Sequence, residues 1–146
     1  MEFDTNVRLA VYQHFASTGY APVLAKVAAE LGCSDGDVRA AYSRLRANRV
    51  LLLEPDGETI RMAPPFSGVP TPHTVEVGRQ TYFANCAWDA LGIPAALHLE
   101  AVVRSSCGQS GTPLRLQVGP GGPEPSPWFF HCQVPAARWW VDLVFT

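Results

Sequence analysis

The sequence predicts an α+β protein in which a helical N-terminal part precedes a part built around a small mixed β-sheet. Up to residue 48 the apolar residues recur at the spacing of helices, whereas later segments alternate between apolar and polar residues, as strands do. Twelve of the 13 prolines and nine of the 12 glycines lie after residue 54, where turns between strands are expected. Together these patterns predict helices first and strands afterwards.

Capping residues, prolines and glycines divide the N-terminal third into three predicted helices, 4–17, 22–31 and 34–48. Gly19 ends the first helix, and Pro22 has the fixed φ that suits the first turn of the second. Ser34 and Asp37 have the spacing of a capping signal at the start of the third. We therefore expect three short helices packed through their apolar faces.

A predicted hairpin follows the helices, because 50–53 and 59–62 are apolar runs that flank the turn sequence Pro55-Asp56-Gly57. Three helices and a hairpin have the order of a winged helix-turn-helix, so residues 1–63 are predicted to form a winged-helix-like helical domain. Arginines of the third helix could face phosphates, or they could form its solvated face. The formal net charge of −2 makes nucleic acid an unexpected partner.

The second half begins with a proline-rich stretch, 64–80, which is predicted to be a linker or extended segment between domains. The domain after it, 81–146, is predicted to combine a helix near residue 86 with further strands. Alternation and β-prone residues place the strands at 99–105, 113–118, 128–134 and 142–146. Pro135 begins a short helix over 136–140.

The apolar runs, the N-terminus and the cysteines indicate the cellular compartment. No apolar run approaches the roughly 20 residues of a membrane span, and the N-terminus lacks a basic-then-apolar signal, so a cytoplasmic protein without membrane partners is expected. The cysteines are widely spaced and form no C-x-x-C pair, which favours free thiols over a disulfide framework. They are Cys33, Cys86, Cys107 and Cys132.

Cys86 and Asp89 are the candidate reactive pair, because they share a helix face three residues apart in a small, apolar run. Asn85 is the predicted N-cap, which would place Cys86 at the positive end of the helix, where a thiolate is favoured. Such a pair combines a soft nucleophile with a proton carrier. The alternative is structural: Cys86 would be buried for packing, and Asp89 would cap a turn or pair with an arginine.

Two blocks of residues in the second half are typical of one enzyme family. They are Tyr82-x-x-x-Cys86-Ala87-x-Asp89-x-Leu91-x-x-Pro94-Ala95, and Val103-x-Ser105-Ser106-Cys107 followed by Ser110-Gly111-x-Pro113-Leu114. With these blocks and the helices and hairpin before them, the sequence resembles the organomercurial (alkylmercury) lyase family, as a divergent or C-terminally shortened member.

The resemblance implies a detoxifying lyase that cleaves a carbon–mercury bond by protonolysis. Thiolate sulfur is a preferred ligand of soft metals, so Cys86 would bind the mercury of a small organomercurial. Asp89 would shuttle the thiol proton to the leaving carbon. No cofactor is implied: Hg(II) is the bound product, and a low-molecular-weight thiol or a mercuric-reductase-type acceptor would remove it. Cys107 would have a structural, buried role.

The sequence departs from the family at its end. The family has a second metal-binding cysteine on a strand after a short helix, and here the predicted strand 142–146 stops about where that residue would come. Cys132 is the candidate substitute, which makes Cys86, Asp89 and Cys132 the predicted transient mercury ligands. Two alternatives stay open: other thiol-dependent small-molecule chemistry or soft-metal binding without lyase activity, and a winged-helix metal-responsive regulator.

Aromatic residues are concentrated near the C-terminus, at Trp128, Phe129, Phe130, Trp139 and Trp140. They are predicted to build the core around the sheet, or to line a pocket for the apolar organic group of a substrate.

Overall fold

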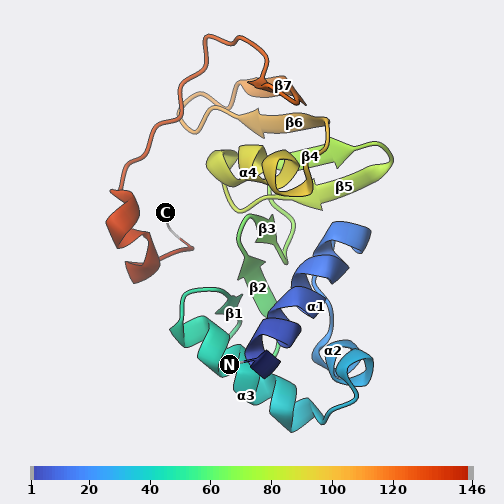
Figure 1. The fold of residues 1–146 in the computed structure, drawn as a ribbon. Coiled ribbons are helices and arrows are strands. Elements are labelled where there is room, and N and C mark those ends of the chain that lie inside the picture. The colour runs from blue at the N-terminus through green and yellow to red at the C-terminus, as the bar shows by residue number, and fades with distance from the viewer. Residues whose placement is uncertain (1, 145–146) are drawn as a thin grey trace.

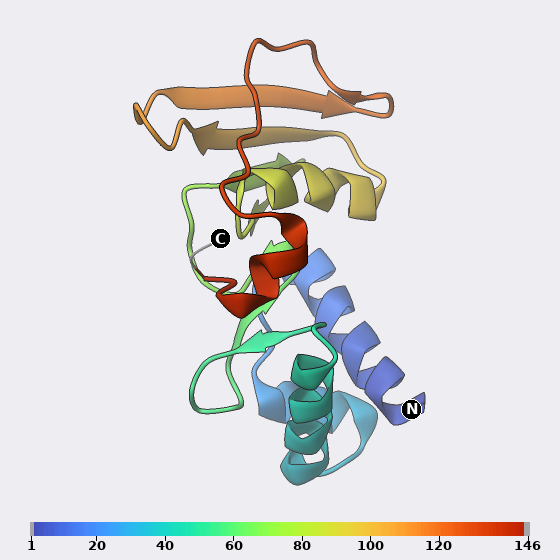
Figure 2. The ribbon, with the colours of Figure 1, turned by 90° about the vertical axis from the view of Figure 1, so that its left-hand side faces the viewer.

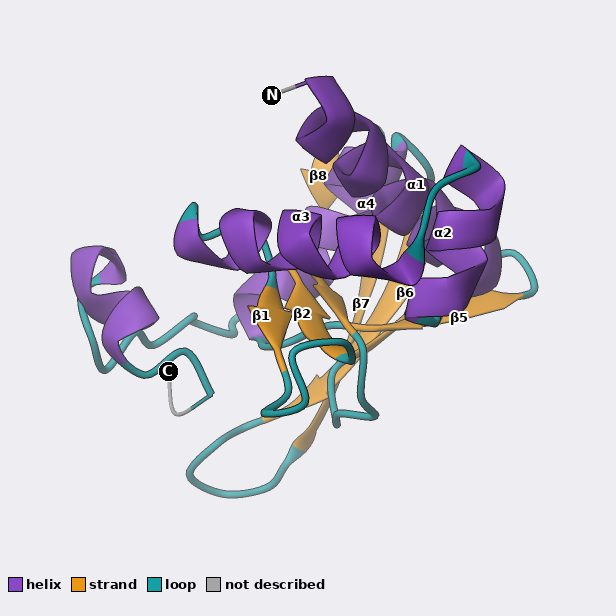
Figure 3. Cartoon of the chain, turned by 90° about the horizontal axis from the view of Figure 1, so that it is seen from below, coloured by secondary structure: helices purple, strands orange, loops and turns teal. Residues whose placement is uncertain are grey.

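Three helices open the chain, and strands make up most of the regular structure after them. The computed structural model describes residues 2–144. Figure 1 shows the three N-terminal helices at one end of the molecule and a five-stranded sheet at the other. Figure 3 views the chain from below, with helices and strands distinguished by colour. The predicted α+β class is confirmed.

The N-terminal helices are α1 (Glu2–Thr18), α2 (Leu24–Leu31) and α3 (Asp35–Ala47). The predicted capping box of α3 is present: Ser34 Oγ accepts from the Asp37 backbone N–H, and the Asp37 carboxylate accepts from the Ser34 backbone N–H. Gly32 ends α2 in the left-handed conformation, with φ of 65°. The buried faces share one core, which includes Val11, Phe15 and Tyr42.

The predicted hairpin is formed by β1 (Leu52–Leu53) and β2 (Ile60–Ala63), which pair antiparallel, and β3 (Phe66–Ser67) adds a third strand. Asp56 stabilises the turn, because its Oδ1 accepts from the backbone N–H groups of Glu58 and Thr59, both at 2.8 Å. Three helices and this small sheet follow the predicted order of elements, and the winged-helix assignment remains a prediction.

The larger sheet has the order β5-β4-β6-β7-β8. Its strands are β4 (Thr74–Val77), β5 (Gln80–Phe83), β6 (Ala101–Ser106), β7 (Pro113–Gly119) and β8 (Gly122–Pro123). The pairings among these described strands are antiparallel, so the sheet predicted as mixed contains no parallel pair. Helix α4 (Ala87–Leu97) lies on one face of the sheet, against β4 and β6 (Figure 1).

The predicted linker, residues 64–80, includes β3, β4 and the first residue of β5. Its residues are thus built into both sheets, and the division of the chain at 63 and 80 remains a prediction. Among residues 2–144, no helix combines the length and the apolar character that crossing a membrane requires.

Phe66 joins the two parts of the molecule. Its ring stacks on Phe15 of α1, with centroids 5.3 Å apart, and tilts against Tyr82 of β5 at 5.7 Å. The Tyr82 hydroxyl donates to the carbonyl of Ala16, at 2.6 Å. The Gln80 side chain of β5 also donates to the carbonyl of Thr18, at 2.8 Å. Aromatic burial and these hydrogen bonds therefore fix α1 against the larger sheet.

The predicted strand at 128–134 is wrong. These residues form no strand, and most are exposed, including Phe129 at 93%. The short edge strand β8 ends in Pro123, and prolines at 125, 127 and 135 interrupt the ladder that a further strand would need. The prediction that aromatic side chains here build the core is wrong as well, since Trp128 and Phe130 are exposed.

The end of the described chain forms a 3-10 helix, η1 (Ala136–Val141), close to the predicted helix 136–140. Figure 2 shows the segment before it running from the sheet past α4. The strand predicted at 142–146 is wrong over 142–144, which form a turn, and residues 145–146 lie outside the described residues.

Replacing Phe66 by alanine should lower the free energy of unfolding by about 3–5 kcal/mol, because the change leaves a cavity between the two parts. Urea denaturation would measure the loss. Phe129→Ala is the matched control, and its expected effect is within about 0.5 kcal/mol, since the side chain is exposed. Equal losses in the two variants would contradict the role given to Phe66.

Candidate active site

Cys86 is the N-cap of α4, with extended backbone at φ of −151°, and its Sγ accepts from the backbone N–H of Asp89 at 3.5 Å. The sequence therefore predicted the correct helix end for Cys86, but it placed the N-cap one residue too early. The prediction that Asn85 caps the helix is wrong, because the Asn85 side chain points to other partners. Cys86 and Asp89 lie in the same first turn, as their spacing predicts.

Asn85 connects this turn to the backbone at the start of β3. Its Nδ2 donates to Oδ2 of Asp89 at 2.9 Å, and also faces the carbonyl oxygens of Phe66 at 3.2 Å and Pro65 at 3.4 Å. The sequence did not predict this role of Asn85. The spacing of Asn85 and Asp89, i and i+4, carried a signal for their contact, whereas the contact with residues 65 and 66 depends on the tertiary fold.

Burial raises the pKa of the Cys86 thiol above its ordinary value, and the negative charge of Asp89 adds to the rise. The backbone N–H groups of Asp89 and Trp88 act in the opposite direction. The N–H groups at the helix end favour a thiolate, as expected, but desolvation outweighs them in the free protein. Cys86 holds its proton more tightly than an exposed thiol does.

Burial also raises the pKa of Asp89, while the hydrogen bond from Asn85 lowers it. Burial raises the pKa of the Tyr12 hydroxyl on α1, and the nearby charge of Asp89 adds to the rise. The Tyr12 hydroxyl itself donates to the carbonyl of Pro64 at 3.0 Å. The N-terminal part thus borders the site, which nothing in the sequence pattern indicated.

Cys132 was predicted to lie on a strand, but it lies on the exposed C-terminal segment, where no strand forms. Its charge is a minor cause of the raised pKa of Cys86, and two residues earlier Phe130 contacts Trp88 of α4, with ring centroids 5.6 Å apart. Cys132 Sγ donates to the carbonyl of Val134 at 2.8 Å. The segment therefore brings Cys132 to the neighbourhood of Cys86.

The three predicted mercury ligands are nonetheless separate in this structure. Within residues 2–144, no three histidine, cysteine or acidic side chains are grouped so that they could hold a metal ion. Cys86 and Asp89 share one helix turn, and Cys132 lies beside them on a different segment. The geometry is that of a thiol–carboxyl pair with a further thiol nearby.

Cys107 lies apart from this pair, in the turn between β6 and β7. It is partly exposed, so the expected burial in a core is wrong, and the turn itself holds the residue through backbone bonds with Gly111 and Thr112. Hydrogen bonds from the side chain and backbone of Ser110 lower the pKa of the Cys107 thiol. A structural role in this turn remains the prediction for Cys107.

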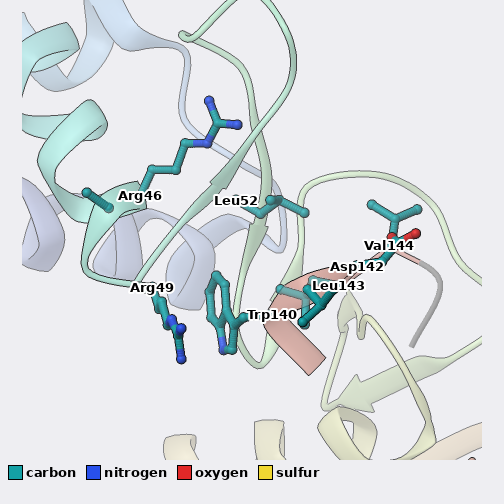
Figure 4. Close-up of a pocket in the computed structure, with 9 residues that line it drawn as sticks. Arg46, Arg49, Leu52, Trp140, Asp142, Leu143 and Val144 are labelled. Atoms are coloured by element: carbon teal, nitrogen blue, oxygen red, sulfur yellow. The ribbon is translucent and has the colours of Figure 1, made fainter. Parts of the chain in front are cut away.

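Two hollows open elsewhere on the molecule. One, of about 400 Å³, lies between η1 and the end of α3, and Figure 4 shows Arg46, Arg49 and Trp140 around it. The other, of about 490 Å³, lies between the end of α4 and β7–β8. Neither is lined by Cys86, Asp89 or Cys132, so the reactive pair is not enclosed by either hollow.

Comparison with known proteins gives a consistent family. The family model described as alkylmercury lyase matches residues 66–146, which is more than half of the chain and includes Cys86, Asp89 and Cys132. An alkylmercury lyase of Streptomyces lividans is 49% identical over 51 residues, which cover 35% of this chain and 24% of that protein. One from Bacillus cereus is 38% identical over 52 residues, covering 36% and 24%.

The chain spans about a quarter of the length of the curated relatives that it matches. A solved structure, the mercury-bound form of MerB2, superposes with a TM-score of 0.65 at 22% sequence identity, covering 83% of this chain and 59% of that chain. At this level of identity the structural likeness shows a shared fold.

The two thiols with opposite pKa shifts should react with iodoacetamide over different pH ranges. Only thiolate reacts, so alkylation of Cys86 should reach half its maximum at a higher pH than alkylation of Cys107, because the pKa of Cys86 is raised and that of Cys107 is lowered. Asp89→Asn removes a negative charge and should move the Cys86 midpoint to lower pH.

Peptide-resolved mass spectrometry would follow both cysteines in one sample. Glu76→Gln is the control, since Glu76 pairs with Arg104 on the larger sheet and should leave both midpoints unchanged. A Cys86 midpoint below that of Cys107 would contradict the assignment.

Proposed function

The chain belongs to the alkylmercury lyase family, and from this premise we propose that it cleaves the carbon–mercury bond of small organomercurials at Cys86 and Asp89. The observation that carries the proposal is the thiol at the N-cap of α4, hydrogen-bonded to the backbone of a partly buried aspartate in the same turn. Soft thiolate sulfur prefers mercury, and a neighbouring carboxyl can carry the proton that the reaction must move.

The first step exchanges a proton for the metal. An organomercury cation approaches Cys86, the sulfur–mercury bond forms, and the thiol proton passes to the Asp89 carboxylate. The raised pKa of Asp89 makes its carboxylate a better proton acceptor than an exposed one, while the N–H groups at the helix end stabilise the sulfur as its proton leaves. Burial raises the pKa of both groups, so the pair retains the proton that it later delivers.

The second step breaks the carbon–mercury bond. The proton of Asp89 is delivered to the carbon, the electron pair of the carbon–mercury bond becomes the new carbon–hydrogen bond, and Hg(II) stays on Cys86. No oxidation state changes, so the step needs neither an oxidant nor a reductant. An external thiol, or the thiols of a mercuric-reductase-type acceptor, would then take Hg(II), which gives the protein a detoxifying role in the cytoplasm.

Cys132 is proposed as the second sulfur ligand. It lies on an exposed segment without helix or strand, so a change of side-chain rotamer and release of the Val134 carbonyl could bring its sulfur to mercury held by Cys86. A second thiolate would donate further electron density to the metal and weaken the carbon–mercury bond.

A second candidate function is soft-metal binding without cleavage. It is favoured by the separation of Cys86 and Asp89 from Cys132 in the described structure, which leaves mercury on Cys86 with fewer ligands. The regulator alternative is less favoured, because two of the α3 arginines that could face phosphates are engaged with carboxylates: Arg39 pairs with Glu58, and Arg44 with Asp4 at 2.6 Å.

Release of benzene from phenylmercury in the presence of excess small thiol tests the proposal. Wild type should turn over, and Cys86→Ser should lose activity. Asp89→Asn should slow the reaction about 10²- to 10⁴-fold, the usual contribution of a positioned proton carrier. Cys132→Ser should lower the rate if this thiol is the second ligand.

Cys33→Ser is the matched control, because Cys33 lies beside the end of α2 and contacts the carbonyl of Ala28. It should be fully active. Mercury binding by wild type without hydrocarbon release would overturn the lyase proposal in favour of the metal-binding candidate.

The organic group is proposed to contact Trp88, which lies between Cys86 and Asp89 in the sequence and is 55% exposed. Its ring packs on Phe130, so an aromatic surface borders the reactive turn. Trp88→Ala should lower kcat/KM for phenylmercury about 10-fold relative to methylmercury, because an aryl group loses more apolar contact than a methyl group.

Leu99→Ala is the control for this substitution, since Leu99 is equally exposed, at 54%, but follows the far end of α4. It should leave the ratio between the two substrates unchanged. An unchanged ratio in Trp88→Ala would remove Trp88 from the substrate surface.

A further inference from the structure

Asn85 ties the proposed proton carrier to the body of the protein. It precedes Cys86, and its Nδ2 donates to Oδ2 of Asp89 at 2.9 Å. The same nitrogen faces the carbonyl oxygens of Phe66 and Pro65, at 3.2 and 3.4 Å. An amide nitrogen carries two hydrogens, so one can serve the carboxylate and the other the β3 backbone at the same time.

We propose that Asn85 is a positioning residue for carbon–mercury cleavage: it holds Oδ2 of Asp89, so that the other carboxylate oxygen, Oδ1, exchanges the proton with Cys86 and the substrate carbon. The inference rests on the proposed function of Cys86 and Asp89. It adds the identity of the residue that aims the carboxylate and of the oxygen that carries the proton.

The direction of the amide is fixed by its surroundings. Three oxygen atoms face Nδ2, and a flipped amide would place its own oxygen against all three. Oδ1 of Asn85 is buried and finds no hydrogen-bond partner among residues 2–144. An unpaired buried acceptor is unfavourable, so the contact of Nδ2 with the Asp89 carboxylate must offset this cost.

Hydrogen-bond chemistry then selects the oxygen. Oδ2 already accepts an N–H, and a proton on the same side of that oxygen would face the amide hydrogen. A proton leaving the Cys86 sulfur is therefore placed on Oδ1. In the second step the Oδ1–H bond breaks, the proton joins the carbon, and the carbon–mercury electron pair forms the new carbon–hydrogen bond.

Neighbouring groups do not supply the same contact. Tyr12 is the titratable group that α1 places near Asp89, but its hydroxyl donates to the carbonyl of Pro64. Cys132, from the C-terminal segment, donates to the carbonyl of Val134. Asn85 is the side chain whose hydrogen bond to Asp89 the structure shows.

The test separates mercury binding from bond cleavage. Asn85→Leu keeps a similar volume and removes the N–H donors, so Cys86 should still bind Hg(II), measured by the ultraviolet thiolate–mercury absorption, within about 2-fold of wild type. Benzene release from the preformed phenylmercury complex in a single turnover should slow about 10- to 100-fold, the cost of a misplaced reacting group. Asn85→Gln retains the amide and should recover part of the rate.

Thr71→Val is the matched control, because Thr71 Oγ1 donates to the carbonyl of Ala84, next to Asn85, at 2.5 Å without contacting Asp89. It should bind and cleave as wild type does. Wild-type cleavage rates in Asn85→Leu, or parallel losses of binding and cleavage in Asn85→Leu and Thr71→Val, would overturn the positioning role alone. A wild type that binds mercury but releases no benzene would overturn the proposed function, and the positioning role with it.

Discussion

The burial of Phe66 is the packing constraint on which the site depends. Its ring lies between Phe15 of α1 and Tyr82 of β5, so it joins the helical part to the larger sheet. Its backbone pairs with Ala84, and its carbonyl faces the Asn85 amide. One residue therefore fixes both the position of α1 and the backbone from which α4 begins. The position of the turn that carries Cys86 and Asp89 therefore depends on this packing as well as on α4.

Two opposing influences meet at Cys86 and Asp89. Burial disfavours the thiolate and the carboxylate, whereas the N–H groups at the start of α4 and the Asn85 amide favour them. Because burial is the larger influence on both groups, the free protein keeps the thiol proton. A soft metal reverses this balance, since the sulfur–metal bond replaces the sulfur–hydrogen bond. In the proposed reaction, the thiol proton of Cys86 would therefore pass to Asp89 only when a ligand that binds sulfur strongly is present.

Local signals in the sequence predicted the elements that depend on local interactions. Ser34 and Asp37 located the start of α3, and alternation located β7 at 113–118, within one residue of its end. The spacing of Cys86 and Asp89 placed both in one turn. The contacts of Asn85 with residues 65 and 66 could not be predicted, because they depend on how β3 packs beside α4. The run Trp128-Phe129-Phe130 has strand propensity, but the edge strand β8 is only two residues long and ends in Pro123, so tertiary context overrides propensity there.

The different exposure of Cys86 and Cys132 suggests a second role for the C-terminal segment in the proposed reaction, the release of mercury. Cys86 is partly buried, where water is limited and the charge of a thiolate or carboxylate is less screened, and Cys132 is exposed. Cleavage benefits from the first environment, whereas transfer of Hg(II) to an external thiol requires the second. Because thiolates exchange soft metals by direct attack, a sulfur at the surface beside a sulfur in the site would let mercury leave stepwise. The loop that the sequence predicted to be a strand would then serve the reaction through its freedom from the sheet, since a residue fixed in a ladder could not approach both Cys86 and solvent.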